Sequence, residues 1–177
     1  SETILIQSNE GDNGDGVENP FELLVSATVT APQQEITVLI DSAIITDGQT
    51  TSILIGYAAP GQTGFSKTFT IRNDGNDALV LDAGSFVNTA HFIVSTPAAL
   101  SLAVGQSTMF TVTLKTDAIW SGGSELISFT NNDADNGDGV ESPFTFLVSG
   151  KVSISGPEIS VLDKNTNIAN GQSTPIA

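Results

Sequence analysis

Cysteine is absent from this sequence of 177 residues, and basic residues, histidine and large aromatic residues are scarce. Without cysteine there is no disulfide, and no thiolate that could act as a nucleophile or a metal ligand. Only 5 Lys and Arg residues stand against 20 Asp and Glu residues, so the formal net charge is −15. This charge repels nucleic acid phosphates and anionic membrane surfaces, and it favours cations as partners. We therefore expect no binding of nucleic acid.

Long apolar runs are also missing. No stretch approaches the roughly 20 apolar residues of a membrane helix, so we expect no membrane insertion. The first ten residues, SETILIQSNE, lack the basic start and the apolar run of a signal peptide, which predicts either a removed signal or an excerpt from a longer protein. Many acidic residues lie in loops with Gly and Asn, whereas Val, Ile, Thr, Phe and Leu dominate the segments between them. The chain is therefore expected to fold.

A glycine-broken acidic loop that runs into an alternating apolar strand occurs twice. Residues 132–150 read NDADNGDGVESPFTFLVSG, and residues 9–27 read NEGDNGDGVENPFELLVSA. The copies are 123 residues apart. At this spacing residues 2–54 align without a gap with residues 125–177, and about half of the positions are identical. The sequence therefore predicts a tandem repeat.

The repeat predicts how the chain is divided. Residues 1–30 correspond to the C-terminal hairpin of a preceding module, 31–34 to a linker, 35–152 to a complete module, 153–156 to a second linker and 157–177 to the opening strand of a following module. A lone hairpin with a full apolar face is marginal in water.

Three explanations of the two end pieces stay open. In the first, the chain is a segment of a longer array of modules. In the second, identical protomers complete each other head to tail through strand exchange at exposed strand edges. In the third, the ends are frayed. The head-to-tail explanation has a weakness, because the two end pieces together lack the middle strands of a module.

The segments between the loops are typical of β-strands. Phe110, Val112 and Leu114 alternate with threonines, and NDGND at residues 73–77 is a strong turn signal. We count seven main strands at short spacing and find no convincing helical period. The sequence therefore predicts an all-β fold, an antiparallel immunoglobulin-like β-sandwich in tandem repeat.

Several blocks in order carry a resemblance to a known family. They read PEISVL with NIANGQST, then FTIRNDGNDALVL, STPAALSLAVGQSTMFTVTL and FTNNDADNGDGVESPFTFLVSG. Together they resemble the immunoglobulin-like repeat of bacterial choice-of-anchor D surface proteins, a relative of the ASH and hydin-like domains. The resemblance covers residues 35–152 and both end pieces, and the closing loop departs from it by the insertion NGDGV. It implies a secreted or cell-surface stalk, adhesin or filament module without catalytic residues.

The acidic loops are candidate calcium sites, because calcium takes six to eight oxygen ligands. The candidate carboxylates are Asp133, Asp135, Asp138 and Glu141 in one copy, and Glu10, Asp12, Asp15 and Glu18 in the other. Asn131, Asn132 and Asn136 interleave with the former set. Four carboxylates within nine residues repel one another, and a divalent cation would relieve that repulsion. The spacing misses two ligand positions of an EF-hand, so a site here would be an irregular hairpin-loop site.

A solvated hairpin loop is the alternative, with Asn-Gly and Asp-Gly chosen for positive φ. In an immunoglobulin-like sandwich this loop would lie at the pole where the first strand begins, where calcium would rigidify the joint between modules. Asp41 and Asp47 near the linker are minor candidates for a junction ligand. Asp74 and Asp77 are expected to form a turn rather than to bind a ligand.

The sequence offers little for catalysis. His91 is the only histidine, and no Gly-x-Ser-x-Gly motif or phosphate-binding loop is present, so we expect no enzyme activity. Trp120 and Tyr57 could stack on a sugar, although isolated aromatics are more typical of core or corner positions.

The sequence favours an extracellular structural repeat module of a surface stalk, adhesin or filament. In this interpretation the module is stiffened by calcium and assembles end to end with neighbouring copies. The alternatives are a carbohydrate- or receptor-binding module and an accessory domain of a secreted enzyme.

Overall fold

The computed structural model describes residues 1–9, 19–133, 139–154, 161–163 and 166–168. The chain divides into two compact units, Ser1–Pro32 and Gln33–Ala177. No helix in the described part of the chain has the length and apolar character that crossing a membrane requires.

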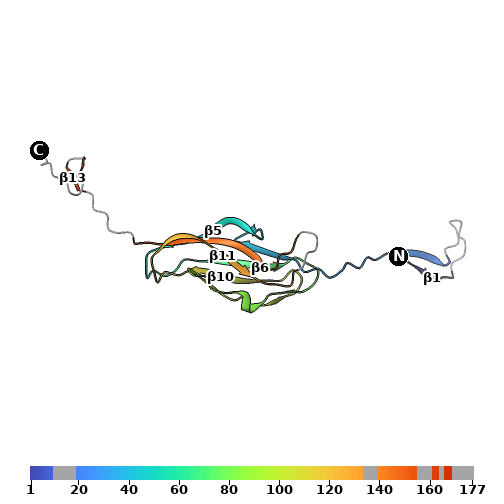
Figure 1. The fold of residues 1–177 in the computed structure, drawn as a ribbon. Coiled ribbons are helices and arrows are strands. Elements are labelled where there is room, and N and C mark those ends of the chain that lie inside the picture. Colours follow the sequence, from blue (N-terminus) through green and yellow to red (C-terminus); the bar gives the residue numbers. More distant parts are fainter. Residues whose placement is uncertain (10–18, 134–138, 155–160, 164–165, 169–177) are drawn as a thin grey trace. The chain divides into compact units, whose positions relative to one another are not determined.

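The second unit contains a β-sandwich built from short strands. Its strands are β3 (Ile36–Ile40), β4 (Ala43–Ile45), β5 (Gln49–Ala58), β6 (Ser66–Asn73), β7 (Leu79–Val80), β8 (Phe92–Val94), β9 (Ser101–Leu102), β10 (Ser107–Leu114), β11 (Trp120–Phe129) and β12 (Phe144–Val152). They form a five-stranded sheet of order β4-β3-β6-β10-β8, a three-stranded sheet of order β11-β12-β5 and the small pair β7-β9. The two larger sheets lie against each other (Figure 1), and the buried core contains residues from strands of both. A 3₁₀ turn, η1 (Ala83–Ser85), lies between β7 and β8 in the chain.

Alternation in the sequence explains why these strands form and which face they bury. In β10 the side chains of Phe110, Val112 and Leu114 are buried, whereas the alternating Met109 is exposed and Thr111 and Thr113 are only partly buried. Successive side chains of a strand point to opposite faces, so this alternation places one apolar row toward the other sheet. The expected all-β sandwich is confirmed.

Phenylalanines from both sheets meet in the core. The ring of Phe69 on β6 lies 5.0 Å from that of Phe146 on β12 and 5.2 Å from that of Phe110 on β10. Phe129 on β11 stacks on Phe86 at 4.8 Å. Aromatic pairs at these separations contribute about 0.5–1.5 kcal/mol beyond the burial of their area. The hairpin β11-β12, which we call the closing hairpin, therefore packs its inner face against the five-stranded sheet and buries the apolar side of that sheet.

One pair of strands departs from the antiparallel pattern of the sandwich. β5 pairs with β12 in parallel. The cause lies just before β5, where the chain leaves β4 in one sheet and joins the other sheet. Asp47 accepts a hydrogen bond from the Thr145 amide at 2.6 Å, and the Gly48 amide donates to the Thr145 carbonyl at 2.8 Å. These bonds place the start of β5 beside the start of β12, so the two strands run in the same direction.

The first unit is the hairpin of β1 (Glu2–Ile6) and β2 (Phe21–Val25). Its cross-strand pairs have the same register as β11-β12 at a spacing of 123 residues. Ile4 faces Leu23 as Ile127 faces Phe146, and the other four pairs of the hairpin correspond in the same way.

The second hairpin outside the sandwich is β13 (Val161–Asp163) with β14 (Thr166–Ile168). It has the register of β3-β4 at the same spacing, because Val161 faces Ile168 as Val38 faces Ile45. The two flanking hairpins thus reproduce the pairing of the closing and the opening hairpin of the module.

Candidate functional site

The start of β3, together with the turns beside it, forms what we call the opening pole of the module. Asp133, at the start of the closing loop, reaches this pole. Its Oδ2 accepts a hydrogen bond from the Ile36 amide at 2.8 Å, and the residue is only 5% exposed. The closing loop therefore begins where the first strand of the module begins, as the sequence predicted for an immunoglobulin-like sandwich.

The asparagines before Asp133 hold the backbone of this pole. Asn131 Oδ1 accepts from the Asp133 amide at 2.7 Å, and its Nδ2 donates to the Glu141 carbonyl at 2.9 Å. Asn132 Oδ1 accepts from the Val80 amide at 2.6 Å. These two side-chain oxygens, which the sequence offered as calcium ligands, are thus engaged in joining the closing loop to itself and to β7.

Most of the predicted calcium ligands lie outside the described residues. These are Asp135, Asp138, Glu10, Asp12, Asp15 and Glu18, as well as Asn136. The structure places Asp133 and the partly buried Glu141 at the opening pole. Within the parts of the chain that are described, no three Asp, Glu or His residues are grouped so that they could hold a metal ion.

The turn at residues 73–77 completes the opening pole. The buried Asn73 side chain donates to the carbonyls of Asp77 and Leu102, at 2.8 and 2.9 Å. A Cβ atom on Gly75 would lie 2.3 Å from the Gln33 carbonyl oxygen, so the chain before β3 packs directly on this glycine. Gln33 thus belongs to the packed module, although the sequence placed it in the linker.

Both aspartates of this turn act as turn formers, as expected. Asp77 Oδ1 accepts from the Ala78 amide at 2.8 Å, and Asp74 Oδ2 accepts from the Thr37 hydroxyl at 2.6 Å. Arg72 donates to Asp74 through Nε at 2.6 Å. The hydrogen bond from Arg72 and, more weakly, that from Thr37 hold the pKa of Asp74 below its usual value although partial burial opposes the shift.

The minor junction candidates have structural positions. Asp47 binds the Thr145 amide and hydroxyl at the start of β12, as described above. Asp41 lies in the turn between β3 and β4 with a φ of 55°, a conformation that Asp tolerates better than most residues. Neither position identifies a ligand.

The other end of the sandwich, the closing pole, contains a cluster that the sequence did not reveal. The rings of His91 and Trp120 stack with centroids 4.1 Å apart, and His91 Nδ1 is hydrogen-bonded to the Glu125 carboxylate. Phe92 packs edge-on against Trp120 at 5.7 Å. Trp120 packs against the core, as the core interpretation predicted. His91 and Glu125 are 34 residues apart, so no local motif could have indicated their contact.

Glu125 has a perturbed pKa in this cluster. Partial burial raises its pKa, but hydrogen bonds from Thr89 and His91 outweigh that effect, so the pKa lies below its usual value. The carboxylate is therefore held in its charged form beside the His91 ring.

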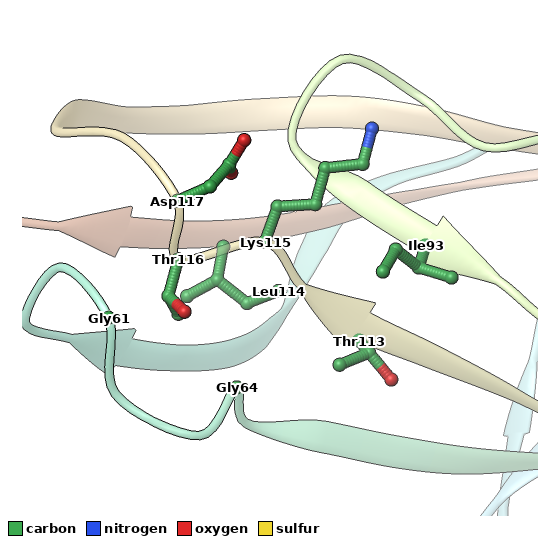
Figure 2. A pocket seen from close by; sticks show the side chains of 8 residues that line it. All are labelled: Gly61, Gly64, Ile93, Thr113, Leu114, Lys115, Thr116 and Asp117. Atoms are coloured by element: carbon green, nitrogen blue, oxygen red, sulfur yellow. The ribbon is translucent and has the colours of Figure 1, made fainter.

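A pocket of about 540 Å³ lies at the closing pole between the loop at residues 59–65, β8 and the end of β10 (Figure 2). It is lined by Gly61, Gly64, Ile93, Thr113, Leu114, Lys115, Thr116 and Asp117. Lys115 Nζ donates to the Thr89 carbonyl at 2.7 Å, and the Thr116 hydroxyl donates to the Gln62 carbonyl at 2.6 Å. Two of the polar groups in the lining are therefore bonded to backbone carbonyls of neighbouring loops.

A smaller hollow of about 260 Å³ lies on the outer face of the three-stranded sheet. Its lining is Leu54, Tyr57, Ser121, Gly122, Gly123, Ser124, Ser149, Gly150 and Lys151. Tyr57 is 64% exposed, which makes it the more accessible of the two aromatics considered for sugar stacking.

Comparison with known proteins gives no family. No family model matches the sequence, and neither does any curated protein. Among solved structures, the chain is similar to the Vibrio cholerae VesB protease, with 13% identity and a TM-score of 0.38 over 69% of this chain and 32% of the protease chain. It is also similar to a protein of unknown function from Porphyromonas gingivalis W83, with 14% identity and a TM-score of 0.43 over 76% of this chain and 77% of that chain. Likenesses this distant support no conclusion about function.

Proposed function

We propose that this chain is a structural repeat unit of an extracellular surface stalk, adhesin or filament, in which sandwich modules follow one another end to end. The observation that carries the proposal is the recurrence of strand register at a spacing of 123 residues on both sides of the module. A repeated unit with the same pairing in each copy is the organisation of an array of modules.

The chemistry of the module supports a structural role. The buried core is extensive, and the polar side chains at the opening pole are used to hold strands and turns together. The formal charge of −15 favours solubility and keeps long arrays of this kind from associating nonspecifically.

Antibody labelling of the cells that produce the chain tests this proposal. Antibodies raised against the 177-residue chain should label intact cells or detect the chain in the culture medium. An antibody against a cytoplasmic protein, which should bind only after permeabilisation, is the control. Labelling by the first antibody only after permeabilisation, with none of the chain in the medium, would contradict an extracellular role.

We also propose that the closing loop binds calcium and stiffens the opening pole. The support is the density of carboxylates in the loop sequence, together with the position of Asp133 beside the first strand of the module. A cation bound by the loop would link it to the start of β3 by reducing the repulsion among the carboxylates.

Thermal unfolding with calcium and with a chelator tests the calcium proposal. We expect calcium in large excess over its dissociation constant to raise Tm by about 5 °C or more. The combined substitutions Asp135→Asn, Asp138→Asn and Glu141→Gln should remove the shift, whereas Asp117→Asn at the closing pole should leave it unchanged. An equal Tm in both solutions would contradict calcium binding and would indicate that the loop is a solvated hairpin loop.

A second candidate function is carbohydrate binding at the hollow around Tyr57. The exposed ring beside serine hydroxyls and glycines is the observation that favours it, because sugars stack on accessible aromatic faces and bind hydroxyls. A glycan screen with Tyr57→Ala as the test variant should show saturable binding that this substitution abolishes. Binding that is lost instead in Trp120→Ala, or no binding, would argue against this site.

A further inference from the structure

The hairpin β1-β2 presents a continuous apolar face to solvent. Its side chains are Ile4 (46% exposed), Ile6 (52%), Phe21 (47%), Leu23 (46%) and Val25 (41%). The cross-strand register places all five on one side of the hairpin, because Ile4 faces Leu23, Ile6 faces Phe21, and Val25 faces Glu2. An apolar face of this size on an isolated hairpin calls for a partner.

The same chain shows what covers such a face. The equivalent side chains of β11-β12, found 123 residues later, are Ile127, Phe129, Phe144, Phe146 and Val148, and each is at most 2% exposed. Their cover is the inner face of the five-stranded sheet, where Phe69 contacts Phe146 and Phe110 contacts Phe129. A hairpin with the same register and the same apolar positions fits the same kind of surface.

The carboxylate of Glu2, at the edge of this apolar face, also indicates which kind of partner covers the face. Glu2 occupies the position of Glu125, and Glu125 is hydrogen-bonded to His91, which directly precedes β8 of the covering sheet. A lipid surface or an arbitrary apolar protein would leave a carboxylate at this position without a donor when the face is buried. A second copy of the covering strands would supply a histidine to it.

The edge of the hairpin gives the position of one further strand. In the module, β12 lies between β11 and β5, and β5 runs parallel to it. Among the described residues, β2 pairs with β1 only. A complete module cannot act as the partner, since its inner face is already covered by its own β11-β12. The partner is therefore a copy of the strands that precede β11, equivalent to residues 33–123.

We infer that the apolar face of β1-β2 docks onto the inner face of a five-stranded sheet formed by a second copy of residues 33–123. A copy of β5 then runs parallel along the edge of β2, and a copy of His91 bonds to Glu2. The interaction surface is thus a sheet face together with one strand edge. This inference rests on the repeat organisation that underlies the proposed function.

The test extends the chain at its N-terminus with a copy of residues 33–123, which then joins Ser1 as residue 123 joins Ser124 in the module. Amide hydrogen exchange of β1 and β2 is measured in the extended and the parental chain. We expect exchange to slow about 100-fold or more in the extended chain, because buried ladder hydrogen bonds open rarely. Equal exchange rates would overturn the inference, and so would an added segment that stays unfolded, because the hairpin is proposed to complete it.

Two matched substitutions locate the docking face. Leu23→Asp lies on the apolar face and should abolish the added protection of the hairpin. Leu24→Asp lies on the opposite face, where Leu24 is 69% exposed, and should leave the protection unchanged. Loss of protection in both variants or in neither would place the partner elsewhere.

A cysteine pair tests the parallel edge, and the absence of native cysteine makes the result unambiguous. Ser149 pairs with Leu54 in the module, so Ser26, its equivalent, should pair with the added copy of Leu54. Cysteines at these two positions should form a disulfide, since paired strands bring Cα atoms within disulfide range.

Ser149→Cys with Leu54→Cys in the native module is the positive control, and Ser26→Cys with the native Leu54→Cys should not cross-link. Cross-linking only in the positive control would overturn the inference, while the result of the antibody labelling would be unaffected.

Discussion

The hairpins β1-β2 and β11-β12 have the same cross-strand register and opposite burial. Ile4 and Leu23 are nearly half exposed, while Ile127 and Phe146 at the equivalent positions are fully buried. Local sequence is therefore enough to specify the strand pairing and the apolar side of each of these two hairpins. Burial depends on which other strands are present, and this is where most of the stabilisation of the module arises.

The largest expected effect is a difference between equivalent core positions. Phe146→Ala should lower the free energy of unfolding of the module by about 4 kcal/mol, because it leaves a cavity beside Phe69. Leu23→Ala in β2 should change it by less than about 0.5 kcal/mol. Urea unfolding followed by fluorescence of Trp120, the single tryptophan, reports on the module alone. Equal losses in the two variants would mean that the hairpins are energetically coupled.

A smaller effect is expected at the glycines of the opening pole. Gly75→Ala should destabilise the module by about 2–3 kcal/mol, because the new Cβ would clash with the chain before β3. Gly105→Ala is the matched control, since this glycine has a φ of 74° and open space around the added atom. It should cost about 1 kcal/mol, from backbone strain alone. An equal cost for both would show that the contact between Gly75 and Gln33 contributes little.

The next comparison concerns Asp133 and Glu10, which occupy equivalent positions in the two copies of the acidic loop sequence. Asp133→Ala should destabilise the module by about 2 kcal/mol, because the buried Ile36 amide loses its acceptor. Glu10→Ala should leave the unfolding of the module unchanged. Calorimetry in the presence of a chelator separates this effect from any effect of calcium. A destabilisation by Glu10→Ala as large as that by Asp133→Ala would contradict the separation of the two units.

The smallest effect concerns Glu125 and its equivalent, Glu2. Glu125→Gln should reduce stability at pH 7 by about 1 kcal/mol, because it weakens the bond to His91. The pKa of Glu125 is lower in the folded state than in the unfolded state. The ionised carboxylate therefore stabilises the fold fully at a pH above its unfolded-state pKa, and this stabilisation is lost as the pH falls through its folded-state pKa. The difference between wild type and variant should therefore shrink below about pH 4. Unfolding curves from pH 7 to pH 3 check this, and Glu2→Gln should show no such pH dependence.

Much of the fold could be predicted, because its signals are local. Alternation along β10 and the NDGND turn indicated the strands, the core side and the roles of Asp74 and Asp77. The parallel pairing of β5 with β12 could not be predicted in this way. It depends on hydrogen bonds between Asp47 and Thr145, which are 98 residues apart in the sequence.

The candidate site was predictable only in outline. The position of the closing loop beside the first strand followed from the expected topology, and the Asp133 contact with Ile36 confirmed it. The use of Asn132 to hold β7 was not visible in the sequence, where the same residue was a candidate ligand. Polar side chains near a loop look alike in sequence whether they bind a cation or a backbone amide, since both uses require the same oxygen.

The sequence by itself determined the repeat, most of the strands and the excess of negative charge. The repeat follows from comparing one part of the sequence with another, the strands depend on residues that are close together in the chain, and the charge depends on composition alone. Only the tertiary structure decided that β5 runs parallel to β12, that His91 stacks on Trp120, and that one of two equivalent hairpins is buried while the other is exposed. The physical reason is that packing brings together groups from distant parts of the chain, and the same apolar face is stabilised only where another sheet removes it from water.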